Sequence, residues 1–132
     1  MPSNNKKSEF QKTPLYKAQR SDRYSRQELI LSIEKITNRT LIIYEANLWR
    51  LGHALGEEDI QPFGDLLFRL PEKENVDLLI HSPGGDIDAT EKIIIMCREI
   101  AKGFRVIVPE YAKSAATLIA LASDEIIMGL TS

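Results

Sequence analysis

The sequence predicts an α/β fold in which a mostly parallel sheet is flanked by helices. Short apolar segments of the kind found in buried strands alternate with longer segments of helical periodicity. Strands that are separated by helical crossovers pair in parallel. The 132 residues, 43% of them hydrophobic, match one globular domain or part of a larger one.

Residues 1–24 are expected to form a flexible leader, because they are polar and contain two prolines. Residues 1–26 hold seven Lys or Arg and two acids, a net charge of +5, whereas the rest of the chain carries −7. Such a basic leader can meet anionic lipid, nucleic acid or an acidic protein surface. It lacks a series of aromatic residues for stacking on bases, so we expect no nucleic-acid partner and keep peripheral membrane contact open.

The composition predicts a cytoplasmic protein. No apolar run approaches the roughly 18 residues of a membrane-spanning helix, and the first residues lack the apolar core of a secretory signal. The single cysteine, Cys97, cannot form an internal disulfide. With only two histidines beside it, a structural zinc site is not expected, and we expect no cofactor.

The domain is expected to occupy residues 25–132, beginning with a helix. Ser25 and Glu28 have capping-box spacing, and apolar residues at helical spacing follow them. Residues 41–44 are a short apolar run of strand type. A loop with two glycines leads to Glu57–Asp59, whose acids suit the positive end of a second helix. The apolar positions of that helix are 63, 66, 67 and 70.

The second half of the chain continues the alternation. Further strands are expected at 76–80, 104–108 and 125–128. A helix from about 88 to 102 separates the first two, and Gly103 stands where a C-terminal glycine cap belongs. Residues 115–122 are apolar all round, so this fourth helix is expected to be buried.

Two unusual loops follow the second and third strands, Ser82–Asp86 and Glu110–Ser114. Ligands of open α/β sheets bind beyond the carboxyl ends of the strands, and the parallel order places both loops at that rim. Gly84 and Gly85 can adopt a positive φ, so their amide hydrogens can turn toward one point. Such a pocket could hold a phosphate or the oxyanion of an acyl-transfer intermediate, although a tight strand-to-helix turn is the commoner use.

Ser114 has two interpretations. At the start of a buried helix its hydroxyl could be an N-cap, which is the commoner role. It could also be a nucleophile, with the Ala115 amide hydrogen as a second oxyanion donor beside Gly85. The small side chains around it would then leave room for a substrate carbonyl.

No residue is a convincing base for that serine. Lys113 is adjacent in sequence, but neighbouring side chains diverge, so a solvated charge is favoured. His81 lies beside the glycine loop and is more simply a polar residue satisfied at a strand end. His53 has no identifiable partner, and Asp86 and Asp88 are more plausible as acids at a helix N-terminus.

The segment Leu78–Ala89, followed by Ser114 within Ala112–Thr117, resembles the Clp protease/crotonase superfamily and, within it, the serine dehydrogenase proteinase family. The resemblance implies a serine-type peptidase related to signal peptide peptidase A and to the Clp proteolytic subunit. It carries over Ser114 as the nucleophile and the Gly85 and Ala115 amides as the oxyanion hole. Gly84 would help to shape the peptide-binding loop.

Relatives take the base, a Lys or a His/Asp pair, from sequence well after the nucleophile. Only 18 residues follow Ser114 here, so the base is expected beyond residue 132. We therefore expect a truncated Clp/crotonase-type domain, either the front part of a longer protein or a degenerate form, that is inactive alone. Relatives often have glycine where Ala115 and Ala116 stand.

Two other functions are compatible with the sequence. A non-catalytic module of the same fold would bind a peptide or a partner subunit, and a crotonase-like enzyme would bind acyl-CoA. The resemblance implies a protein or peptide substrate and a homo-oligomer, since relatives assemble into rings or dimers. An uncovered sheet edge favours assembly as well.

Overall fold

The computed structural model describes residues 14–46 and 54–132, in two compact units divided after Ile36. The first unit contains α1 (Pro14–Gln19) and, apart from its last residue, α2 (Ser21–Thr37). The second unit contains all of the strands.

The expectation of a flexible leader through residue 24 is wrong for residues 14–24, which are almost entirely helical. Pro14 occupies the first helical position, where its missing N–H costs no hydrogen bond, and good helix formers follow it. Ser25 lies inside α2, so it caps no helix. The boundary between units also lies after Ile36 rather than after residue 24. Residues 1–13 of the predicted leader lie outside the described residues.

The second unit is a four-stranded sheet in the order β1-β2-β3-β4, with every neighbouring pair parallel. The predicted α/β class with a parallel sheet and flanking helices is therefore confirmed. In chain order the elements are β1 (Thr40–Glu45), α3 (Glu57–Leu67), β2 (Asn75–His81), α4 (Ile87–Ile100), β3 (Gly103–Val108), α5 (Ala115–Leu121) and β4 (Glu125–Met128).

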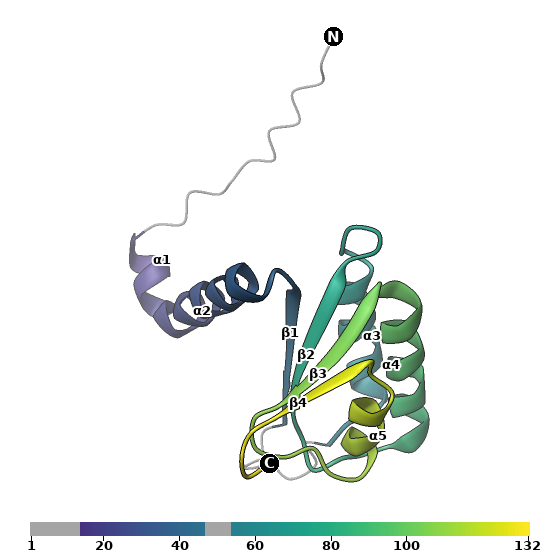
Figure 1. Ribbon diagram of the computed structural model, residues 1–132. Helices are drawn as coiled ribbons and strands as arrows, with labels where there is room; N and C mark the ends of the chain where they lie inside the picture. The colour runs from purple at the N-terminus through teal and green to yellow at the C-terminus, as the bar shows by residue number, and fades with distance from the viewer. Residues whose placement is uncertain (1–13, 47–53) are drawn as a thin grey trace. The chain divides into compact units, whose positions relative to one another are not determined.

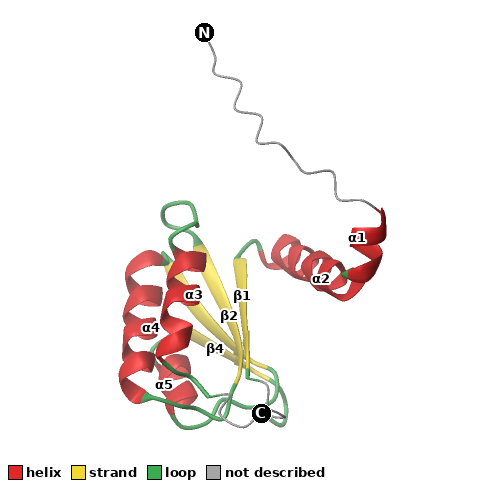
Figure 2. Ribbon diagram, turned by 180° about the vertical axis from the view of Figure 1, so that it is seen from behind, coloured by secondary structure: helices red, strands yellow, loops and turns green. Residues whose placement is uncertain are grey.

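Helices α3, α4 and α5 lie together on one face of the sheet (Figures 1 and 2). Alternate residues of the strands point to this face and form the core with the helices. Burial of each large apolar side chain contributes about 1.5–3 kcal/mol. The central members are Phe63, Leu67, Val76, Leu78, Ile80, Ile93, Cys97, Phe104, Val106 and Ile119.

Two details of the predicted helices are wrong. Helix α5 is buried on one side only, because β3 and α4 cover that side, and Leu121 stays 68% exposed. Gly103 is not a helix cap but the first residue of β3, and the C-cap of α4 is Ala101. Only Ala101 and Lys102 separate α4 from β3.

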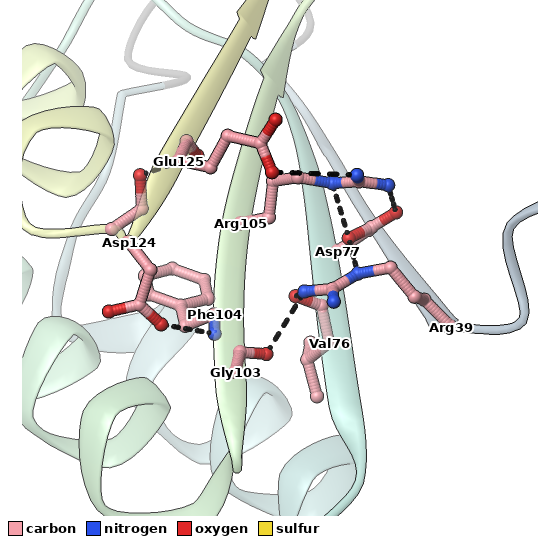
Figure 3. Close-up of polar contacts among 9 residues, drawn as sticks. Arg39, Val76, Asp77, Gly103, Phe104, Arg105, Asp124 and Glu125 are labelled. Atoms are coloured by element: carbon pink, nitrogen blue, oxygen red, sulfur yellow. Dashed lines mark hydrogen bonds and ion pairs between the residues drawn. The ribbon is translucent and has the colours of Figure 1, made fainter.

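The opposite face of the sheet carries an ionic cluster around Asp77 (Figure 3). Asp77 is only 1% exposed, and its carboxylate accepts hydrogen bonds from Arg39 and, at 2.6 and 3.0 Å, from Arg105. The bonds to Asp77 raise the pKa of Arg105. Arg39 also donates to the carbonyl oxygens of Val76 and Gly103, at 3.2 and 3.1 Å. The cluster therefore connects the residue before β1 to the starts of β2 and β3.

Asp124 attaches the start of β4 to β3. Its carboxylate accepts the Phe104 N–H at 2.9 Å (Figure 3). It also accepts a hydrogen bond from Arg98 at 2.8 Å. These two donors stabilise the charged form, first the Phe104 amide and then Arg98, so the pKa of Asp124 is lowered. The edge strand is thereby held in register with its neighbour.

Cys97 is expected to be unreactive in the folded protein. Cys97 lies on the buried side of α4, and burial raises the pKa of its thiol to about 12, so almost no thiolate exists at neutral pH. Mass spectrometry after iodoacetamide treatment at pH 8 should show alkylation only in denaturant. Stoichiometric alkylation of the native protein within minutes would contradict the buried position.

Candidate active site

The loops that follow β2 and β3 meet at the carboxyl ends of the strands. The Ser82 N–H donates to the Tyr111 carbonyl oxygen at 3.3 Å, and the Lys113 N–H donates to the Ser82 carbonyl oxygen at 3.0 Å. These bonds pair Ser82 with Ala112 as a parallel bridge beyond the regular sheet. The predicted convergence of the two loops at one rim is therefore confirmed.

Gly84 lies directly against Ser114. A Cβ atom added to Gly84 would stand 2.6 Å from the Ser114 Cβ and 2.8 Å from the Lys113 carbonyl oxygen. Gly84 has a φ of +113°, which L side chains rarely adopt. Both the backbone conformation and the close approach to Ser114 therefore require glycine at this position.

Ser114 has an unusual backbone conformation, with φ 52° and ψ −125°. A non-glycine residue at positive φ costs about 1–3 kcal/mol, and such strain is concentrated at functional sites. Ser114 occupies the N-cap position of α5, but its side chain makes no capping hydrogen bond. The commoner of the two interpretations, an N-cap hydroxyl, thus lacks the hydrogen bond that defines it.

In the glycine loop the Gly84 amide hydrogen is hydrogen-bonded, whereas that of Gly85 has no acceptor among the described residues. The Gly84 N–H donates to the Ser82 Oγ at 3.1 Å, and the Gly84 carbonyl oxygen accepts the Leu55 N–H at 2.8 Å. Within residues 14–46 and 54–132, neither the Gly85 amide hydrogen nor that of Ala115 has an acceptor. These are the two amides that the sequence singled out as candidate oxyanion donors.

Leu55 is a part of the site that sequence reasoning missed. Its N–H donates to the Gly84 carbonyl oxygen, and its carbonyl oxygen accepts the Asp86 N–H at 2.8 Å. Leu55 thus pairs with Gly85 as a short parallel bridge. A Cβ on Gly85 would lie 2.1 Å from the Leu55 carbonyl oxygen. No local motif marks Leu55, because backbone atoms make these contacts.

Neither candidate base in the described residues is bonded to Ser114. The His81 Nδ1 lies 3.7 Å from the Glu110 Oε2, and its ring is 4.2 Å from that of Tyr111. The Lys113 ammonium lies 5.1 Å from the centroid of the Tyr111 ring. The side chains of His81 and Lys113 thus both contact the Tyr111 ring. His53 lies outside the described residues.

Asp86 caps helix α4, as its position after the glycines predicts. Its carboxylate accepts the Ala89 N–H at 2.7 Å, and Asp88 lies in the first turn of the same helix. The interpretation of these two residues as acids at a helix N-terminus is confirmed. Asp86 also fixes where the glycine loop ends and α4 begins.

A cavity of about 300 Å³ borders the loop that carries Ser114. It lies between β3, α5 and β4, and most of the side chains around it are apolar. Those nearest to the serine loop are Tyr111, Ala112, Lys113 and Thr117. The cavity has room for an uncharged side chain of a bound molecule.

The family model of ClpP-like SDH-type serine proteinases matches residues 62–131, which include both loops of the site. The chain belongs to this family. The membership suggested by the glycine loop and Ser114 is thereby confirmed at the level of the family. Among the described residues, no helix has both the length and the apolar character needed to cross a bilayer.

Two proteins of Methanocaldococcus jannaschii are similar to part of the chain. The uncharacterized protein MJ1495 is 50% identical over 58 residues, and the uncharacterized protein MJ0137 is 48% identical over 58 residues. In both cases the match covers 44% of this chain and 20% of the relative. The chain thus matches about a fifth of the length of these relatives.

Proposed function

We propose that this chain supplies the nucleophile and the oxyanion-binding amides of a serine-type peptidase. The observation that carries the proposal is the backbone of Ser114, which is held at positive φ against Gly84 while its hydroxyl makes no capping bond. Ser114 and Gly85 are both exposed, so a substrate can reach them. In this proposal the amides of Gly85 and Ala115 would flank the carbonyl oxygen of the bound substrate.

In the proposed reaction the Ser114 Oγ attacks the carbonyl carbon of a peptide bond. A C–O bond forms, the hydroxyl proton passes to a base, and the carbonyl electrons move to the oxygen. The Gly85 and Ala115 amide hydrogens would stabilise that oxyanion, because they have no other acceptor among the described residues. When the oxyanion collapses, the C–N bond breaks and the base protonates the leaving amine. Water then hydrolyses the ester of Ser114.

The base of the proposed reaction is a Lys or a His/Asp pair outside the described residues. His81 and Lys113 contact Tyr111 instead of Ser114, which supports an external base. The largely apolar cavity beside Thr117 suggests that the substrate presents an apolar side chain near the scissile bond. We therefore infer a peptide or unfolded protein segment as the substrate.

A fluorophosphonate probe is expected to label the protein, as its gene encodes it, at one residue. The probe reacts with activated serines, so Ser114→Ala should abolish the labelling while the protein still folds. Mass spectrometry of the labelled peptide gives the site. The matched control is Ser123→Ala, since Ser123 is a hydrogen-bonded serine at the far end of α5.

Equal labelling of the Ser114→Ala variant would show that another residue reacts. Absence of labelling, combined with peptide binding, would favour a non-catalytic module. The contacts of His81 and Lys113 with Tyr111 instead of Ser114, within the described residues, are also compatible with such a module. Binding of coenzyme A without labelling would favour a crotonase-like enzyme. Labelling that is lost in Ser114→Ala, peptide binding without labelling, and coenzyme A binding without labelling therefore separate the three functions.

A further inference from the structure

We propose that Ser82 is a positioning residue, which aims the Gly85 amide hydrogen at the substrate oxyanion. The inference rests on the proposed function and deepens it. Ser82 is fully buried, at the junction of the two loops. Its hydroxyl oxygen accepts the Gly84 N–H at 3.1 Å, so its side chain determines how the glycine loop leaves β2.

The backbone of Ser82 connects the same residue to the serine loop. Its N–H donates to the Tyr111 carbonyl oxygen, and its carbonyl oxygen accepts the Lys113 N–H. Lys113 directly precedes Ser114. One residue therefore holds both loops, and it sets the separation between the nucleophile and the glycine amides.

The orientation of the Gly85 amide follows from the geometry of the peptide bond. In a trans peptide the carbonyl oxygen and the next amide hydrogen point in opposite directions. The Gly84 carbonyl oxygen points to the Leu55 N–H, at 2.8 Å, so the Gly85 amide hydrogen points away from Leu55. The Ser82 hydroxyl donates to the same Gly84 carbonyl oxygen at 3.4 Å and so opposes rotation of this peptide plane. Its oxygen also accepts the Gly84 N–H, which holds the preceding peptide.

Without the hydroxyl the glycine pair would have more freedom to turn. Glycines rotate with little steric penalty, and a buried amide without an acceptor favours any conformation that finds one. A turned peptide would present the Gly84 carbonyl oxygen, instead of the Gly85 amide hydrogen, to the developing negative charge. This change would raise the free energy of the transition state more than that of the bound substrate.

The test is Ser82→Ala, with Ser123→Ala as the matched control, in the protein as its gene encodes it. We expect the kcat for a peptide substrate to fall about tenfold in Ser82→Ala with KM within about twofold, and both to stay unchanged in Ser123→Ala. A fall in thermal stability without a change in kcat would overturn the proposal. So would a rise in KM at constant kcat, because that pattern indicates weaker binding alone.

A second measurement is independent of turnover. By NMR, exchange of the Gly84 amide hydrogen with solvent should accelerate at least about tenfold in Ser82→Ala relative to Ser123→Ala. Unchanged exchange would overturn the role of the hydroxyl, whatever the kinetics. If the wild-type protein neither turns over peptides nor reacts with a fluorophosphonate, the proposed function fails, and the exchange data still decide whether Ser82 orders the glycine loop.

Discussion

Replacing Asp77 with alanine is expected to lower the free energy of unfolding by about 3 kcal/mol. The substitution leaves Arg39 and Arg105 without the carboxylate that joins them, and both arginines are only 19% exposed. Removing one partner of a buried ion pair costs about 3–5 kcal/mol, and the partial exposure of the arginines places the effect at the lower end. Such a loss is a large part of the 5–15 kcal/mol by which domains are typically stable.

Urea denaturation at neutral pH, followed by circular dichroism, measures this change. Asp65→Ala is the control, because Asp65 is an exposed carboxylate on α3 and its loss should change the free energy of unfolding by less than about 0.5 kcal/mol. Equal effects of the two substitutions would show that the cluster in Figure 3 contributes no more than a surface charge.

Replacing Gly84 with alanine is expected to reduce the fluorophosphonate reactivity of Ser114 at least about a hundredfold. The new methyl group would lie 2.6 Å from the Ser114 Cβ, and 2.8 Å and 3.1 Å from the backbone atoms Lys113 O and Ala115 N. Backbone cannot yield as a flexible side chain does, so Ser114 and the Ala115 amide must move. The φ of +113° adds strain for alanine, so the free energy of unfolding should also fall, by about 1–3 kcal/mol.

Gly64→Ala is the matched control for Gly84→Ala. Gly64 lies inside α3, and a Cβ there would stand 3.5 Å from Met96 Sδ and from Phe68, an ordinary contact distance. Alanine is favoured over glycine in a helix by about 1 kcal/mol, so this variant should be as stable as the wild type or more so. Unimpaired labelling of Gly84→Ala would separate the glycine loop from the reactivity of Ser114.

The strands and the convergence of the loops could be predicted because they depend on local patterns. Each predicted strand lies within an observed one, since apolar runs bounded by turns define buried parallel strands. The rim at which Ser82 meets Ala112 follows from the parallel order alone. The cap of α4 by Asp86 is likewise local, since donor and acceptor lie three residues apart.

Other features could not be predicted because they depend on distant partners. Asp77 lies 28 residues from Arg105 in the sequence, and the strand register places them side by side. A signal did exist, since an acid and a base stand inside otherwise apolar strands at positions that parallel pairing can join. The helices that cover most of residues 14–24 were missed because Pro14 was interpreted as a breaker rather than as a first helical residue.

The sequence by itself determined the alternation of strands and helices, the parallel order of the sheet, and the two residue types, glycine and serine, that meet at its rim. Only the tertiary structure decided which of the two glycine amides stays unbonded and that Ser114 adopts a positive φ. The physical reason is that periodicity and turn chemistry act between near neighbours, whereas the hydrogen bond from the Leu55 N–H to the Gly84 carbonyl oxygen depends on how the loops pack. Leu55 belongs to a separate segment of the chain and contributes only backbone atoms, which side-chain patterns do not reveal.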